Sequence, residues 1–125
     1  MAARCFLVYA LAPKGTTARE ANDRLNEYVA DRRRGLAVWH DHFVGVHGGA
    51  AVLDVRSSEE EALLDDAGPL AGWRISTHPL TFSLSAVGFA AQTSFTLEQY
   101  RDVTLDQLAA TESDDPRFWW KRRSA

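Results

Sequence analysis

The stretch RCFLVYAL, residues 4–11, decides the fold. It is rich in β-branched and aromatic side chains and is followed at once by APKG, residues 12–15. This length, this composition and the Pro/Gly stop predict a strand rather than a helix. Because the strand is apolar on both faces, we expect it to be a central strand that is covered on two sides.

A helix is expected next along the chain. Thr17 and Glu20 have the spacing of a capping box, which marks a helix N-terminus, and Gly35 supplies a stop. Arg32–Arg34 falls in the expected last turn, where positive charge complements the helix dipole. The apolar residues recur at spacings of three and four, as one buried stripe requires; they are Ala21, Leu25, Tyr28 and Val29.

A hairpin, a short helix and a last strand are expected after this helix. The signals are a Gly-Gly turn, serines before an acidic run, and a proline that places part of the last strand at a sheet edge. The order β-α-β-β-α-β predicts an α+β, ferredoxin-like unit. The expected elements are strands at residues 36–46 and 50–55, a helix that carries Leu63 and Leu64 and ends at Gly68-Pro69, and a strand at residues 74–86.

The chain changes character near residue 88. We expect a ferredoxin-like domain over residues 1–88, with residues 89–125 as a C-terminal helical extension and tail of the same domain. The tail is polar except for Phe118-Trp119-Trp120. Tryptophans in such a tail are expected to dock onto a partner subunit or to close a pocket, the alternative being a disordered tail. Two short helices are expected at the caps Thr96 with Gln99 and Thr104 with Gln107.

Composition excludes several classes of function. The net charge of −3, from 14 basic and 17 acidic residues, gives no global attraction to nucleic acid. The single cysteine, Cys5, rules out an internal disulfide. No apolar run reaches the roughly 18 residues that span a bilayer. We therefore expect a cytoplasmic protein with no nucleic-acid or membrane partner.

The sheet of a ferredoxin-like unit has helices on one face only. Because the second face is also expected to be apolar, something must cover it. Either the C-terminal segment folds across it, or a second copy packs its own sheet against it. The second solution is a homodimer, the dimeric α+β barrel.

Residues 35–80 carry a resemblance to known proteins. They contain Gly48-Gly49 in the hairpin, LDVRS before an acidic helix, GPLAGW, and then HPL. This order resembles the dimeric α+β barrel superfamily, and within it muconolactone isomerase-like and YCII-related proteins. The resemblance implies acid-base proton transfer on a small hydrophobic or aromatic carboxylate or lactone, without a cofactor. YCII-related proteins pair a histidine on the first helix with an aspartate before the last strand; Asp66 matches the aspartate, but the first helix has no histidine.

The densest polar and aromatic cluster is Trp39-His40-Asp41-His42-Phe43. Alternate residues of a strand share a face, so we expect His40 and His42 on one side and the other three on the opposite side. The histidines suit general acid-base chemistry. Two alternatives remain: a pair of metal ligands, or an edge strand whose polar residues discourage aggregation.

His78 is expected on the other edge strand, where it could meet His40 or His42 of a partner subunit. We predict no metal site, because one cysteine and two histidines leave a tetrahedral site short of ligands. The alternative function is a non-catalytic small-molecule-binding or accessory protein on the same fold; a third is an interaction module that acts through its tail. The candidate catalytic residues are His40, His42, His78, Asp41 and Asp66, with Tyr9, Trp39 and Phe43 as candidates to shape an apolar substrate cleft.

Overall fold

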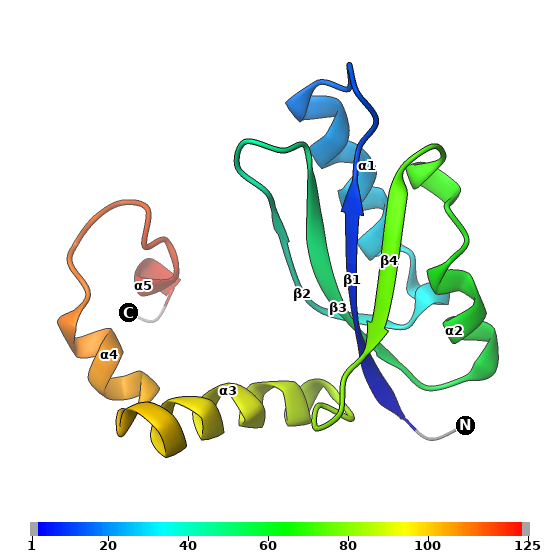
Figure 1. Cartoon of the computed structure of the whole chain (residues 1–125). Helices are drawn as coiled ribbons and strands as arrows, with labels where there is room; N and C mark the ends of the chain where they lie inside the picture. Colours follow the sequence, from blue (N-terminus) through cyan, green and yellow to red (C-terminus); the bar gives the residue numbers. More distant parts are fainter. Residues whose placement is uncertain (1–2, 124–125) are drawn as a thin grey trace. The chain divides into compact units, whose positions relative to one another are not determined.

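The structure, a computed structural model, describes residues 3–123. The chain divides into two compact units, Met1–Ala90 and Ala91–Ala125. Figure 1 labels the helices and strands. The strands are β1 (Arg4–Leu11), β2 (Leu36–His42), β3 (Gly48–Val55) and β4 (Arg74–Pro79). The α-helices are α1 (Ala18–Ala30), α2 (Ser58–Leu64), α3 (Ala86–Arg101), α4 (Leu105–Thr111) and α5 (Trp120–Arg123).

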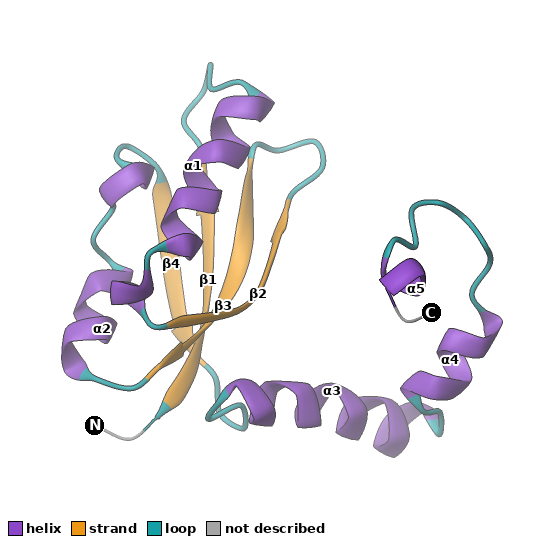
Figure 2. Ribbon diagram, turned by 180° about the vertical axis from the view of Figure 1, so that it is seen from behind, coloured by secondary structure: helices purple, strands orange, loops and turns teal. Residues whose placement is uncertain are grey.

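The strands form one antiparallel sheet in the order β2-β3-β1-β4. Helices α1 and α2 lie on the same side of this sheet, as Figure 2 shows. The order of elements is the β-α-β-β-α-β expected from the sequence, so the α+β, ferredoxin-like arrangement is confirmed at this level. β1 is central and pairs with β3 on one edge and β4 on the other.

Two expected strands are shorter than predicted. β2 ends at His42, and β4 ends at Pro79. The chain beyond Pro79 still bonds β1, because the Leu80 N–H donates to the Cys5 carbonyl and the Cys5 N–H donates to the Ser83 carbonyl, both at 2.9 Å. It then turns, and α3 begins at Ala86, inside the segment expected to be strand.

The C-terminal helices differ from expectation at one cap. Thr104 and Gln107 form the predicted capping box of α4. Thr96, however, lies in the interior of α3 and does not begin a helix. Its hydroxyl donates to the Gln92 carbonyl one turn back, at 2.9 Å, a bond by which threonine is accommodated inside a helix.

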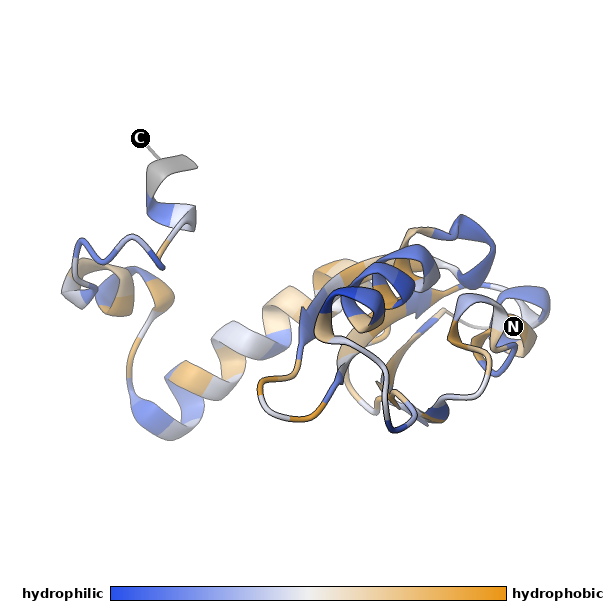
Figure 3. Ribbon diagram, turned by 90° about the horizontal axis from the view of Figure 1, so that it is seen from above, coloured by the Kyte–Doolittle hydropathy of each residue, from blue (hydrophilic) through white to orange (hydrophobic). Residues whose placement is uncertain are grey.

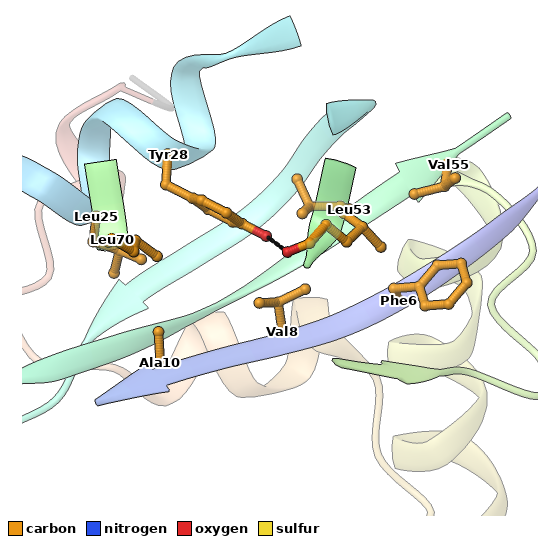
Figure 4. Packing of buried hydrophobic residues seen from close by; sticks show 9 residues of the cluster. Phe6, Val8, Ala10, Leu25, Tyr28, Leu53, Val55 and Leu70 are labelled. Atoms are coloured by element: carbon orange, nitrogen blue, oxygen red, sulfur yellow. Dashed lines mark hydrogen bonds between the residues drawn. The ribbon is translucent and has the colours of Figure 1, made fainter. Parts of the chain in front are cut away.

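The core lies between the sheet and the helices α1 and α2, and Figure 4 shows the packing of its buried side chains. Tyr28 is fully buried there, and its hydroxyl donates to the Leu64 carbonyl at 2.7 Å. Burial, slightly opposed by the nearby charge of Arg34, raises the pKa of Tyr28 to about 12. The phenol therefore stays a neutral donor at ordinary pH. The core also contains Phe6, Val8, Ala10, Leu25, Leu53, Val55, Leu64 and Leu70.

Arg34 closes the end of this core. The sequence assigned it to the last turn of α1, but α1 ends at Ala30 and a separate 3-10 turn follows. The side chain of Arg34 is only 3% exposed. Its guanidinium donates to the carbonyls of Leu63 and Asp66, each at 3.2 Å, and lies 4.4 Å from the centre of the Tyr28 ring. The arginine therefore ties the end of α2 to α1 rather than complementing a helix dipole.

The second unit has a different character. None of its described residues is buried, and Figure 3 shows hydrophobic and hydrophilic residues interleaved along α3. The aromatic tail forms a local cluster, with the rings of Phe118 and Trp120 5.0 Å apart. The indole N–H of Trp120 donates to the Glu112 carboxylate at 3.1 Å. Docking of the tail onto a partner, or its use as a lid, stays a prediction.

Replacing the buried arginine should destabilise the first unit. We expect Arg34→Ala to lower the free energy of unfolding by about 3 kcal/mol, because the carbonyls of Leu63 and Asp66 and the carboxylate of Asp31 lose their buried cationic donor. Arg33→Ala is the matched control: this side chain is 75% exposed, and among residues 3–123 its guanidinium bonds Asp31 alone, so its effect should be much smaller. Urea unfolding followed by circular dichroism measures both. Equal losses in the two variants would contradict the structural role of Arg34.

Candidate functional site

The two faces of the sheet are covered differently. On β1, Phe6, Val8 and Ala10 point into the core beneath the helices. Because side chains alternate along a strand, the intervening Leu7 and Tyr9 point to the opposite face. Figure 1 looks onto that face, with α1 and α2 on the far side of the sheet.

The strand register assigns residues to this second face, here called the open face. Directly paired residues of antiparallel strands share a face and form rows across the sheet. One row is Trp39, Val52, Leu7 and His78, and the next is Asp41, Ala50, Tyr9 and Ser76. A third row adds Leu11 and Arg74. Cys5 and Asp54 lie on the same side of the sheet, but they are buried, and Asp54 is covered by Ala86. The open face is thus made of Leu7, Tyr9, Leu11, Trp39, Asp41, Ala50, Val52, Arg74, Ser76 and His78.

On the open face, the aromatic side chains of β1 and β2 flank the smaller side chains of β3, the strand between them. Tyr9 is 36% exposed and Trp39 is 43% exposed, whereas Ala50 and Val52 of β3 between them are buried. The rings of Tyr9 and His78 stack at 6.2 Å with their planes 10° apart. An apolar, aromatic surface therefore carries a histidine, the side chain that exchanges protons most readily near neutral pH.

His40 and His42 share a face, as predicted, but it is the helix-covered face and not the open face. Their rings meet edge to face at 5.6 Å. The Nε2 atom of His42 lies 3.2 Å from the amide oxygen of Asn26 on α1. These two histidines are therefore separated from His78 by the sheet itself. In a dimer that packs through the open faces they would point away from the interface, so the expected pairing with a partner's His78 has no support in this geometry.

The remaining candidates lie at different places. Asp41 is on the open face, and its Oδ1 atom accepts the His42 N–H at 2.8 Å. Asp66 is in the loop after α2, where its carboxylate accepts the Gly68 N–H at 3.1 Å and fixes a turn. Phe43 follows the end of β2, and its N–H donates to the Gly48 carbonyl at 2.8 Å. Of the predicted site residues, the structure therefore brings Tyr9, Trp39, Asp41 and His78 onto one face.

Sequence reasoning missed Asp54. Its side chain is fully buried, yet it is the acidic residue of the otherwise apolar β3 segment AAVLDV. One carboxylate oxygen, Oδ2, accepts from Arg56 and from the N–H of Ala86, both at 3.1 Å. Asp54 therefore holds the first residue of α3 to the sheet. A charged residue inside a buried strand was the signal that could have found it, since such residues are rarely buried without a partner.

Cys5 is the register partner of Asp54 on β1 and is completely buried. Burial, together with the charge of Asp54, raises the pKa of its thiol, and the cation of Arg56 opposes this only in part. A protonated, buried thiol is a poor nucleophile and a poor metal ligand. Cys5 is therefore a packing residue.

Within residues 3–123, no three His, Cys, Asp or Glu side chains gather in a way that would hold a metal ion. In the same residues, none of the helices combines the length and the apolar character needed to cross a bilayer.

No family model and no curated protein matches the chain. Among solved structures, the uncharacterized protein TM1266 from Thermotoga maritima is similar, with 20% sequence identity and a TM-score of 0.39. The match covers 63% of this chain and 99% of that chain.

Removing the buried carboxylate should loosen the start of α3. We expect Asp54→Ala to lower the free energy of unfolding by about 2 kcal/mol, because the Ala86 N–H loses its acceptor in a buried setting. Hydrogen exchange of the Ala86 amide should accelerate as well. Asp41→Ala, which removes an exposed carboxylate from the neighbouring strand, should change stability by less than about 0.5 kcal/mol. An Ala86 amide that exchanges equally slowly in both variants would refute the anchoring role.

Proposed function

We propose that this protein is a homodimer of the dimeric α+β barrel type that binds a small aromatic or hydrophobic carboxylate on its open face. The exposed aromatic rings of Tyr9 and Trp39 on an apolar sheet face are the observation that supports the proposal. Apolar surface of this kind marks a site for a partner or a ligand. The kinship with muconolactone isomerase-like and YCII-related proteins, suggested by residues 35–80, is part of the same proposal.

The charged groups on the open face favour an anionic ligand. Arg74 and His78 are both on β4, on the same face as Tyr9. A guanidinium binds a carboxylate through two parallel hydrogen bonds, while the stacked rings of Tyr9 and His78 offer a flat apolar wall. A planar ring with one carboxylate matches both features, and neither needs a cofactor.

Binding of 1-naphthoate to the full chain, followed by titration calorimetry, tests the proposal. We expect Arg74→Ala to weaken binding about tenfold or more, since a charge-assisted hydrogen bond is lost. The neutral analogue 1-naphthalenemethanol should bind equally well to both proteins. Arg19→Ala, on the exposed start of α1, is the control and should bind naphthoate as the parent does.

Two outcomes would contradict this function. One is the absence of naphthoate binding at millimolar concentration. The other is equal weakening by Arg19→Ala and Arg74→Ala, because the carboxylate would then be attracted by charge in general rather than by the open face.

Proton transfer by His78 is a second candidate function. It is favoured by the position of His78, which is exposed at the edge of the apolar face and held against Tyr9. A histidine beside a bound unsaturated lactone can remove a proton from one carbon and return it to another, which shifts the double bond.

The isomerisation of α-angelica lactone, followed by proton NMR in heavy water, measures this activity. We expect catalysis that is lost in His78→Ala and kept in His40→Ala, because His40 lies on the helix-covered face. Rates that do not differ among the parent and the two variants would leave binding as the function.

A further inference from the structure

The open face is complementary to itself in size. β1 contributes the large side chains of Leu7 and Tyr9, and the adjacent β3 contributes the small, buried side chains of Ala50 and Val52. Facing layers pack well when large residues of one lie over small residues of the other. A second copy of this chain offers that match if its β3 lies over β1.

The open face is also complementary to itself in charge. One edge strand, β2, contributes the carboxylate of Asp41. The other edge strand, β4, contributes Arg74 and His78 on either side of Ser76, which is in the same row as Asp41. Two copies therefore attract each other when the acidic β2 edge of one lies over the basic β4 edge of the other. They repel each other when like edges meet.

Two limiting symmetric arrangements stack the open faces, and they bring different strands opposite each other. A two-fold axis that runs along the strands places β2 over the partner's β4 and β1 over the partner's β3. A two-fold axis across the strands places each strand over its own copy. The second arrangement places the acidic β2 edge over the partner's β2 edge, and the large side chains of β1 over the same side chains of the partner. Size and charge both select the axis along the strands.

We infer that the second copy completes the binding site. This inference rests on the homodimer of the proposed function and adds which residues the partner contributes. Because rows are kept when the axis runs along the strands, His78 faces Trp39 of the partner subunit. The partner's Asp41 lies one step away, in the row of Ser76.

The composite site joins chemistry that a single chain keeps apart. Within one copy, His78 on β4 and Asp41 on β2 are on opposite edges. Three strand spacings of about 4.8 Å separate them by about 14 Å across the sheet, and they are also offset by one row along the strands. Across the dimer, a ligand ring lies between the Tyr9–His78 stack and the partner's Trp39. The partner's Asp41 accepts an imidazole N–H of His78 and orients the ring, as carboxylates do beside functional histidines. Two such sites form in each dimer, related by symmetry.

Subunit mixing tests the composite site. In the parent background, Trp39→Ala and His78→Ala should each abolish binding of 1-naphthoate as homodimers. When the two variants are mixed and allowed to exchange, each heterodimer carries one intact site. Random exchange therefore restores about one quarter of the parent's binding sites. A site built within one chain would recover no binding, and that result would overturn the inference.

Crosslinking tests the direction of the axis, in a Cys5→Ser background that removes the native thiol. The double variant Asp41→Cys, Ser76→Cys should give covalent dimers with a short thiol crosslinker, whereas each single variant should not. The control is His40→Cys with Thr77→Cys on the helix-covered face, which should stay uncrosslinked. Dimers from Asp41→Cys alone, or no dimers from any variant, would overturn the axis along the strands.

Sedimentation separates failure of this inference from failure of the proposed function. A monomeric parent chain at micromolar concentration contradicts the homodimer, and both proposals fall. If the parent chain is a dimer but fails the mixing or the crosslinking test, the homodimer stands and only the composite site is rejected.

Discussion

β1 is apolar on both faces, but α1 and α2 cover only one of them. Its backbone is hydrogen-bonded to β3 on one edge and to β4 on the other, so the strand cannot turn to hide either face. Phe6 and Val8 are buried under α1 and α2, and this packing fixes the sheet. The same alternation leaves Tyr9 on the far side, next to His78. The candidate site is therefore a consequence of how the core is built.

Two buried charges hold the unit around this sheet. Arg34 joins the end of α1 to the carbonyls that follow α2, above the ring of Tyr28. Asp54 accepts the N–H of Ala86 and so holds the start of α3 to β3. Each charge is bonded to backbone groups of a distant segment. A buried ion is tolerated only with such partners. Arg34 therefore fixes the position of the chain after α2, and Asp54 fixes the position at which α3 begins.

The distribution of histidines limits what chemistry the sheet can support. His40 and His42 contact each other and Asn26 on the helix side, whereas His78 stands alone among the histidines of the sheet on the open face. An acid-base role on a ligand bound to the open face thus falls to His78. The exposed carboxylate on that face, Asp41, is at the opposite edge of the same copy. The other carboxylate on this side of the sheet, Asp54, is buried and is bonded to Arg56 and Ala86. This separation is the physical reason for placing the completed site between two copies.

Local sequence signals determined much of the architecture. The strand RCFLVYAL, the Thr17 cap and the order of elements led to the α+β arrangement, because alternation and capping are properties of neighbouring residues. The sharing of a face by His40 and His42 followed in the same way. Local signals did not determine which face that was, that Arg34 is buried, that Asp54 anchors Ala86, or that β4 stops at Pro79. Those facts depend on contacts between residues distant in sequence, and only the packing of helices against one side of the sheet decided them.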